Sequence, residues 1–414
     1  MSEPRIITLG CRLNTFESEV IRDQIAAAGI INTVIVNTCA VTAESERQAC
    51  QTIRRLRRES PDARIIVTGC AAQINPARFA AMKEVDRVVG NAGKLDAAIL
   101  TGNGEAVVVT DIAEDIAAAG HLLGGFENRT RAFLQVQQGC DHRCTFCIVP
   151  MARGPNRSIA KSRIVEQARM LTANGHKEIV LTGADVSSYG ADLKNRPALG
   201  GLARALLREV PDLKRLRISS LDPAGIDDSL FSLLADEPRF MPHLHLSLQS
   251  ANDAVLKRMK RRHTRASAFD LCRRLRRARP DVALGADLIA GFPTESEDMF
   301  KDTLAAVEEM GLTYLHVFPY SPRPGTPAAR MPQTPSAERK LRAERLRAAG
   351  DTALARFFEA RVGSDARVLA EKDNCGHCEH FAPVRLAFDV EPGTIVDVRI
   401  TGRVAGCLIG ERAS

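Results

Sequence analysis

Three cysteines between residues 140 and 147 carry the strongest chemical signal in this sequence. The segment reads Cys140-Asp-His-Arg-Cys144-Thr-Phe-Cys147 and directly follows an apolar stretch that predicts a strand. Thiols this close together can converge on one metal centre. A structural zinc site normally takes four ligands, and His142 is poorly spaced to supply the fourth. Three thiolates suit a 4Fe–4S cluster that keeps one iron open for another ligand.

A second set of cysteines is dispersed along the first third of the chain. Cys11, Cys39 and Cys70 each follow a short apolar run, ITLG, IVNT and IVTG. The carboxyl ends of the strands in a parallel α/β sheet share one edge, where ligands bind. One such cysteine alone would be interpreted as buried filler. Three in equivalent positions predict a second cluster held by three thiolates.

The remaining cysteines have weaker signals. They are Cys50, Cys272, Cys375, Cys378 and Cys407. The first two lie in expected helices and the last near the chain end, so we interpret these three as structural. Cys375 and Cys378 form a CGHC motif that joins expected strands, whereas a redox CxxC normally opens a helix. A zinc site there would need two more ligands, with His380 as one candidate, and the motif stays unassigned.

The first third of the chain alternates between two kinds of element. Apolar runs at 5–10, 33–38, 64–69 and 86–90 predict buried strands, and helical patterns at 17–28 and 43–58 separate the first three. This alternation favours a parallel sheet with helices on both faces. The following segment, 111–128, has acidic residues, Ala and Gly but no strand pattern, and is expected to be a connection.

A second series of strands and helices follows this connection. Six strands are expected, at 133–139, 178–183, 214–220, 243–250, 283–292 and 313–321. Helical stretches such as 162–174 and 266–279 lie between most of them, which predicts a barrel or partial barrel with its function at the strand carboxyl ends. After a basic helix at 336–361, short strands at 366–372, 381–390 and 394–402 predict a small all-β, OB-like module.

Composition and charge limit the classes of protein that fit. The chain has 414 residues, 45% hydrophobic and 26% charged, which is typical of a globular protein with two or three domains. No apolar run approaches the ~20 residues that span a bilayer, and no secretion signal opens the chain, so a cytoplasmic protein is expected. Residues 257–279 have a net charge of +10, whereas the whole chain has +7, so the charges of the other residues sum to −3. Such a patch favours a polyanion partner, although a solvated helix face is the alternative.

Taken together, these features resemble the radical-SAM (S-adenosylmethionine) methylthiotransferases. The CxxxCxxC spacing, with Phe146 before its last cysteine, is the superfamily motif. Further matches are GCRLNTFESE (10–19), NTCAVTAESERQA (37–49), VTGCAAQ (67–73), FPYSPRPGTPAARMP (318–332), EHFAPVRL (379–386) and PGTIVDVRITG (392–402). The second and fifth of these look most like the branch that modifies N6-threonylcarbamoyladenosine in tRNA.

The resemblance implies an α/β protein with three domains. Residues 1–110 would form the parallel α/β methylthiotransferase domain, and 111–128 a linker. Residues 129–360 would form a partial (β/α)6 radical-SAM barrel, and 361–414 a small all-β TRAM-like domain that binds RNA. The N-terminal domain should then cap the mouth of the barrel.

The resemblance also implies two 4Fe–4S clusters and SAM as cofactors. Cys140, Cys144 and Cys147 would hold the radical-generating cluster, and the dispersed set the auxiliary cluster that carries the sulfur to be transferred. No catalytic residue is expected beyond these ligands. The residues expected to bind SAM are Phe146, Gly183, Asp185, Gln249, Ile289 and Gly291.

The implied partners are a tRNA anticodon stem-loop and an electron donor such as flavodoxin or ferredoxin, for a monomer with no membrane association. Alternative substrates are N6-isopentenyladenosine in tRNA or a ribosomal-protein aspartate. An RNA-binding iron–sulfur sensor without turnover is the alternative from another class. The sequence departs from the family pattern at four positions, Asp185, Asp222, Ser247 and Ala251.

Overall fold

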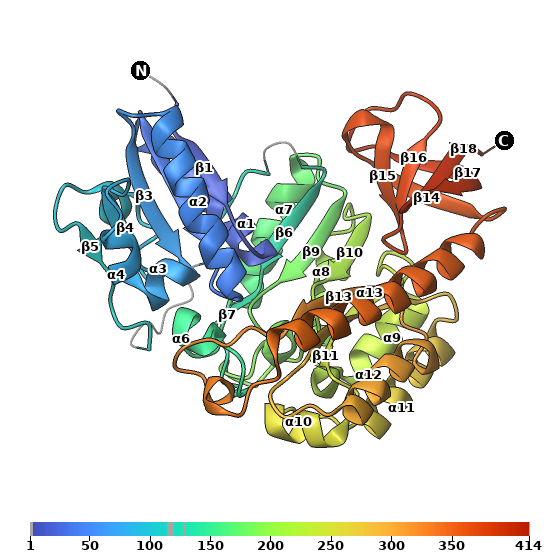
Figure 1. Cartoon of the computed structure of the whole chain (residues 1–414). Coiled ribbons are helices and arrows are strands. Elements are labelled where there is room, and N and C mark those ends of the chain that lie inside the picture. The colour runs from blue at the N-terminus through green and yellow to red at the C-terminus, as the bar shows by residue number, and fades with distance from the viewer. Residues whose placement is uncertain (1–2, 114–119, 127–128, 414) are drawn as a thin grey trace.

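The computed structural model describes residues 3–113, 120–126 and 129–413. Figure 1 shows an N-terminal sheet with its helices beside a central half-barrel, and a small C-terminal barrel at the far end of the long helix α13 (Ser336–Glu359). The α/β architecture with a small closed barrel at the end is the fold class that the sequence predicts. None of the helices in the described ranges is long and apolar enough to cross a membrane.

The N-terminal part contains a parallel sheet in the order β1-β2-β3-β4-β5. Its strands are β1 (Arg5–Thr8), β2 (Thr33–Thr38), β3 (Arg64–Gly69), β4 (Arg87–Val89) and β5 (Val107–Val108). Its helices are α1 (Arg12–Ala27), α2 (Ala43–Glu59), α3 (Cys70–Ile74), α4 (Pro76–Ala80) and α5 (Ala97–Thr101). The central strands β2 and β3 are buried on both faces, which explains their continuous apolar runs.

Two details differ from the sequence expectation. Helix α1 begins at Arg12 rather than at residue 17, because Cys11 has an extended backbone and occupies the N-cap position. The two-residue strand β5 has no equivalent among the expected strands. Within the connection 111–128, the described residues 111–113 and 120–126 form no helix or strand, as expected; the others lie outside the described residues.

The six expected barrel strands form two separate parallel sheets. One has the order β10-β9-β6 and the other β11-β12-β13. The strands are β6 (Arg131–Gln135), β9 (Glu178–Thr182), β10 (Arg215–Ile218), β11 (His243–Gln249), β12 (Ala283–Ala290) and β13 (Tyr314–Pro319). Two isolated bridges, Leu216 to Phe240 and Leu221 to Leu246, connect the halves. The barrel is therefore partial, as expected, but its sheet is not continuous.

Helices cover the outside of this half-barrel (Figure 1). They are α7 (Lys161–Ala173), α8 (Leu199–Glu209), α9 (Asp228–Asp236), α10 (Asp253–Met259), α11 (Arg265–Ala278), α12 (Glu297–Glu309) and α13. The short helix α6 (Val149–Arg153) instead lies against α3 of the N-terminal part. Short 3-10 turns are η1 (Val186–Ser188), η2 (Pro223–Gly225), η3 (Pro327–Arg330) and η4 (Lys372–Asn374). On β11, Leu244, Leu246 and Leu248 pack in the main core, so the alternate residues His243, His245 and Ser247 face the barrel interior.

The expected strand 133–139 divides in two. After Gln135 the chain leaves the sheet, and β7 (Gln137–Gln138) pairs antiparallel with β8 (Arg157–Ser158). Gly139 then turns the chain at φ 71°, and a Cβ there would lie 1.7 Å from the Pro155 carbonyl oxygen. This turn directs the following cysteine loop across the carboxyl end of β6.

The C-terminal part is a closed barrel in the order β14-β15-β16-β18-β17. Its strands are β14 (Asp365–Ala370), β15 (Cys375–Cys378), β16 (Pro383–Leu386), β17 (Ile395–Val404) and β18 (Cys407–Arg412). Val368, Val384, Val398 and Leu408 are nearly fully buried in its core. The CGHC motif is strand β15 itself, so it neither opens a helix nor forms a loop.

Candidate active site between two cysteine sets

The loop between β7 and α6 carries Cys140, Cys144 and Cys147. The thiols are close enough for their charges to influence one another, and the Cys147 N–H donates to the Cys144 carbonyl over 3.1 Å. Burial raises the pKa of Cys140 to about 12 and that of Cys147 to about 11. A raised pKa argues against a free thiolate nucleophile, and each thiol would have to lose its proton to bind a metal.

The number of thiols in each set bears on the kind of metal centre it could hold. A structural zinc normally takes four ligands, whereas three thiolates suit a 4Fe–4S cluster that keeps one iron open. The donor set of each cysteine triplet therefore fits an iron–sulfur cluster.

Two polar side chains flank this loop. Asp185 accepts hydrogen bonds from the Cys140 thiol (3.7 Å) and Ser188 (2.6 Å) and pairs with His142 Nε2 (2.9 Å). Because His142 is bound to Asp185, it is not directed at the thiols. On the other side, Arg261 Nη1 donates to Cys144 Sγ over 3.5 Å. Arg261 thus faces the cysteine loop, although the sequence analysis grouped it with an external basic patch.

The dispersed cysteines meet at one edge of the N-terminal sheet. Cys11 caps α1, Cys39 follows β2, and Cys70 opens α3 directly after β3. Burial, helped by the nearby charges of Cys70 and Cys11, raises the pKa of Cys39 to about 11. The three thiols are therefore neighbours, as the shared strand edge predicts.

Two glycines make this approach possible. Gly10 has φ 102°, and a Cβ there would lie 2.7 Å from the Cys39 Cβ. Gly69 has φ 95°, and a Cβ there would lie 2.5 Å from the Thr38 backbone N. Both backbone conformations are favourable only for glycine. Each glycine directly precedes a predicted cluster ligand, so glycine is required at the turn that places that cysteine.

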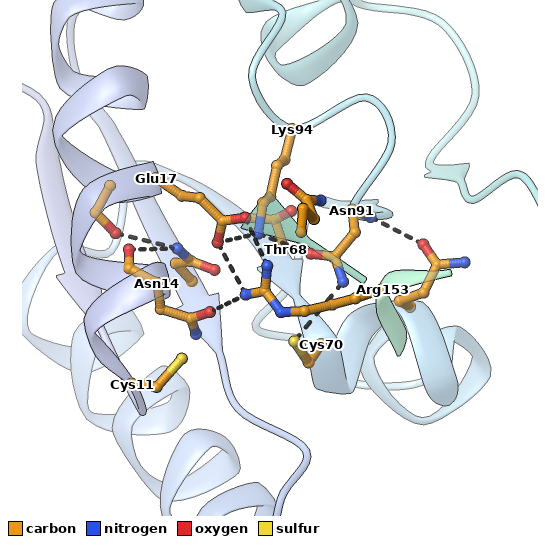
Figure 2. Close-up of polar contacts among 12 residues, drawn as sticks. Cys11, Asn14, Glu17, Thr68, Cys70, Asn91, Lys94 and Arg153 are labelled. Atoms are coloured by element: carbon orange, nitrogen blue, oxygen red, sulfur yellow. Dashed lines mark hydrogen bonds and ion pairs between the residues drawn. The ribbon is translucent and has the colours of Figure 1, made fainter. Parts of the chain in front are cut away.

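A fully buried ion-pair network lies beside the dispersed cysteines (Figure 2). Arg153 donates through Nη1 and Nη2 to the two carboxylate oxygens of Glu17, over 2.8 and 3.0 Å. Lys94 donates to Glu17 over 2.6 Å and to Asn91 over 2.7 Å. Arg153 also donates to Asn14 over 2.6 Å. Burial alone would raise the pKa of Glu17, but these two cations and their hydrogen bonds lower it to about 2.

This network connects the two cysteine sets. Arg153 ends helix α6, which directly follows the Cys140–Cys147 loop, while Glu17 lies on α1, which Cys11 caps. Arg153 and Lys94 share the single carboxylate of Glu17, so one positive charge remains uncompensated near Cys70. The charge of Cys70 raises the pKa of Arg153. Asn91 adds a hydrogen bond to Cys70 Sγ over 3.7 Å. A positive surrounding of this kind favours thiolate ligands.

Local sequence patterns did not reveal this network. Asn14 and Glu17 lie inside the motif 10–19, and Arg153 lies six residues after Cys147. The available signal was that Asn14 and Glu17 share the face of α1 that also carries Leu13, Val20 and Ile21. Their partners lie 77 and 136 residues away, so no local pattern could reveal them.

The six residues expected to bind SAM divide into three groups. Phe146, Gln249 and Ile289 line one cavity of about 230 Å³ together with Asp287. Gly183 and Asp185 lie beside the cysteine loop, where a Cβ on Gly183 would approach Gln137 Oε1 to 2.6 Å. Gly291, with φ 70°, faces α13 instead, because a Cβ there would lie 2.4 Å from Arg339 Cγ. The structure thus brings three of the six to one cavity and gives Gly291 a packing role.

The C-terminal barrel closes the opposite end of the half-barrel. Arg217 donates to the backbone carbonyls of Cys378 and Glu379, each over 2.9 Å. The ring of Phe381 stacks on His243 at 5.0 Å and lies under the guanidinium groups of Arg131 and Arg217. The residues after CGHC therefore form a plug, and the ligand atoms of Cys378, Glu379 and His380 lie within 4.8 Å of one another there.

We expect Phe381→Ala to weaken the packing of the C-terminal barrel against the half-barrel by about 1–2 kcal/mol, since the variant loses aromatic stacking and two cation–π contacts. Limited proteolysis should then cut faster near residues 361–364, which connect α13 to β14. Phe388→Ala is the matched control, because Phe388 packs inside the small barrel itself. Equal cleavage rates in the two variants would contradict the plug.

The geometry described so far defines a protein of the radical-SAM class, with a second three-thiol site in front of the barrel. The Radical SAM superfamily model matches residues 134–307, and that of "Uncharacterized protein family UPF0004" matches residues 4–90. Among solved structures, the radical S-adenosylmethionine methyltransferase TsrM of Kitasatospora setae superposes with a TM-score of 0.56 at 16% identity, covering 79% of this chain and 75% of that one. This likeness concerns the fold alone.

Curated relatives identify the family more narrowly than the likeness in fold does. The threonylcarbamoyladenosine tRNA methylthiotransferase MtaB of Rickettsia prowazekii is 49% identical, over 96% of this chain and 94% of the relative. MtaB of Aquifex aeolicus is 34% identical, over 95% and 98%. The tRNA-2-methylthio-N(6)-dimethylallyladenosine synthase of Novosphingobium aromaticivorans is 38% identical, over 96% and 94%. The chain belongs to the radical-SAM methylthiotransferase family and is most like its threonylcarbamoyladenosine branch.

Proposed function

We propose that this protein is a tRNA methylthiotransferase that adds a methylthio group at C2 of N6-threonylcarbamoyladenosine next to the anticodon, using two 4Fe–4S clusters and two molecules of SAM. The observation that carries this proposal is the pair of three-cysteine sites joined by Arg153. The choice of nucleoside rests on the names of the relatives at 49% and 34% identity.

The proposed reaction needs one cluster that generates a radical and one that carries sulfur, and the two cysteine sets could hold one each. The C2 hydrogen of a purine is not acidic, so acid–base groups cannot remove it. When bound, the reduced cluster and SAM supply a primary carbon radical that can take this hydrogen. Cys140, Cys144 and Cys147 would hold that cluster, and Cys11, Cys39 and Cys70 the auxiliary one.

The surrounding residues position these ligands. Asp185 orients the Cys140 thiol and ties His142 away from it, while Arg261 places a positive charge at Cys144. The Arg153–Glu17–Lys94 network fixes α6 against α1, so it sets the distance between the two cysteine sets. Phe146, Gln249 and Ile289 would line the SAM cavity between them.

Binding of the RNA would depend on neutralising its phosphates. Helix α2 exposes Arg47, Arg54, Arg55 and Arg58, and α11 exposes Arg273, Arg274 and Arg277. Other cations of the expected patches are not available: Arg261 faces Cys144, and Arg342 is buried against Glu295. The target nucleoside must leave its stack to reach the cavity, which favours a single-stranded anticodon loop.

We further propose the domain boundaries 1–110, 111–128, 129–360 and 361–414, with the last domain binding RNA. The enzyme would act as a cytoplasmic monomer and receive electrons from a flavodoxin or ferredoxin. A salt titration tests the RNA interface: the affinity for an anticodon stem-loop should fall steeply with salt, and a flat response would contradict phosphate binding.

Nucleoside mass spectrometry of tRNA from cells with and without the gene tests the reaction. We expect the 2-methylthio form of N6-threonylcarbamoyladenosine to disappear without the gene and to return on complementation. If the isopentenyladenosine derivative disappears instead, the protein acts on the substrate of the second tRNA branch, which the 38% identical relative from Novosphingobium aromaticivorans represents. No change in any tRNA nucleoside would contradict the proposal and favour a ribosomal-protein or sensor role.

A further inference from the structure

Three neighbouring strands of the half-barrel bring two histidines and an aspartate together inside it. His245 lies on β11, Asp287 on β12 and His316 on β13, and these strands pair side by side. His245 Nε2 lies 3.0 Å from Asp287 Oδ1, and His316 Nδ1 lies 3.2 Å from the same oxygen. The ligand atoms of the three residues all lie within 4.8 Å of one another. We call this group the His–Asp–His triad.

The triad lies at the floor of the cavity described above. Asp287 itself borders that cavity, as do Ile289 and Phe318. In the register of β12 and β13, Asp287 pairs with His316. Ile289 pairs with Phe318 one layer nearer the carboxyl ends of the strands. Because the Phe381 plug closes the opposite end of the half-barrel, an ion would reach the triad from the cavity.

Neighbouring residues fix the side chains of the triad. A Cβ on Gly285 would lie 2.3 Å from His245 Nδ1, so glycine at this position makes room for the imidazole ring. Ser247 Oγ donates over 3.4 Å to Asp287 Oδ2, the carboxylate oxygen that the histidines leave free. The His245 side chain is buried, whereas that of His316 is 57% exposed. The triad therefore has a packed side and an open side.

The spacing within the triad matches that of ligands on one metal ion. With metal–ligand bonds of roughly 2.1 Å, two ligands at a right angle lie roughly 3.0 Å apart and two tetrahedral ligands roughly 3.4 Å apart. The two N–O distances, 3.0 and 3.2 Å, fall within this range. An imidazole–carboxylate hydrogen bond has a similar length, but here two imidazoles converge on one carboxylate oxygen beside an open side. Two imidazoles and a carboxylate are a donor set of divalent transition metals, and three protein ligands leave further positions open.

We propose that His245, Asp287 and His316 bind one divalent transition-metal ion at the floor of the cavity. This site goes beyond the proposed function and does not depend on which nucleoside the protein modifies. Its open positions face the cavity, so an oxygen atom of water or of a bound molecule completes the coordination of the ion.

Binding of Mn²⁺ to the cluster-loaded protein, without RNA or SAM, tests the site. Mn²⁺ prefers oxygen ligands to thiolates, so the cysteines compete little for it. The EPR signal of free Mn²⁺ should report saturable binding of one ion per chain, and Zn²⁺ should displace that ion because it binds such sites more tightly. His316→Gln should weaken the binding at least about 10-fold, since even loss of a residue that only supports a metal ligand costs about 10- to 100-fold. Asp287→Asn should weaken it as well, which repeats the test from a second strand.

Glu379→Gln is the matched control. In the described ranges of the chain, Cys378, Glu379 and His380 form a second group whose ligand atoms lie within 4.8 Å of one another. Glu379→Gln should bind Mn²⁺ as the wild type does. Wild-type protein that binds no Mn²⁺, or a His316→Gln variant that binds it as tightly as the wild type, would overturn the proposal. Loss of binding in Glu379→Gln would also overturn it, because the ion would then lie in the C-terminal barrel or depend on the fold as a whole.

The measurement is independent of methylthio transfer. If the wild type modifies tRNA but binds no Mn²⁺, only the metal site is wrong. If it binds one Mn²⁺ through His316 but modifies no tRNA nucleoside, the proposed function fails and the metal site stands.

Discussion

Cys144→Ser and Cys39→Ser are expected to abolish methylthio transfer through different losses. In Cys144→Ser, cleavage of SAM to 5′-deoxyadenosine should fall by about 1000-fold or more, because we propose that this loop holds the cluster that supplies the radical chemistry. In Cys39→Ser, 5′-deoxyadenosine should still form while methylthiolation of the RNA is lost. Each variant should retain roughly half of the wild-type iron. Anaerobic reconstitution, iron analysis and product chromatography provide these measurements.

Cys50→Ala and Cys272→Ala are suitable controls. Both cysteines are buried in helices, at 6% and 1% exposure, and neither lies at a strand end. Their variants should keep the full iron content and both activities, with only a packing cost in stability. If Cys39→Ser loses SAM cleavage as completely as Cys144→Ser does, the two sets would not hold independent clusters. That result would contradict the assignment of separate roles.

Glu17→Gln is expected to destabilise the protein strongly. Glu17 is fully buried and is the carboxylate shared by Arg153 and Lys94, so the amide leaves two buried cations uncompensated. Breaking a buried ion pair by removing one partner costs about 3–5 kcal/mol. Chemical denaturation of the cluster-free protein should therefore show a much lower midpoint. The cluster-loaded protein should lose iron faster, since the network positions α1 and α6 near both cysteine sets.

The same residue predicts a pH dependence. The pKa of Glu17 falls from its ordinary value of 4.5 to about 2 in the folded protein. A lowered carboxylate pKa stabilises the fold fully above pH 4.5, and this contribution disappears as the pH falls toward 2. The shift corresponds to about 3 kcal/mol at neutral pH. The stability difference between the wild type and Glu17→Gln should thus shrink below pH 4.5.

Glu44→Gln provides the matched comparison for this effect. Glu44 pairs with Arg47 on the surface of α2, and exposed pairs contribute little to stability. Its variant should unfold at the same denaturant midpoint as the wild type at all these pH values. If Glu17→Gln behaved like Glu44→Gln, the buried network would not be a stabilising connection between the two parts of the chain.

Local sequence patterns located the buried strands and the cysteine sets well. The runs 33–38 and 64–69 coincide with β2 and β3, because strands buried on both faces require continuous apolar residues. The expected helices 162–174 and 266–279 lie one residue after α7 and α11 at both ends. Each dispersed cysteine follows its strand directly, so the topology of a parallel sheet was enough to predict that the three would meet.

The sequence by itself thus determined the fold class, the two cysteine sets and the family resemblance. Tertiary structure alone decided the Arg153–Glu17–Lys94 network, the contact of Arg261 with Cys144 and the Phe381 plug. Periodicity reports burial along one element, because neighbours in sequence share its environment. It carries no information about which buried charge will meet which: Arg153 and Glu17, for example, lie 136 residues apart and are joined only when the separate parts of the chain pack together.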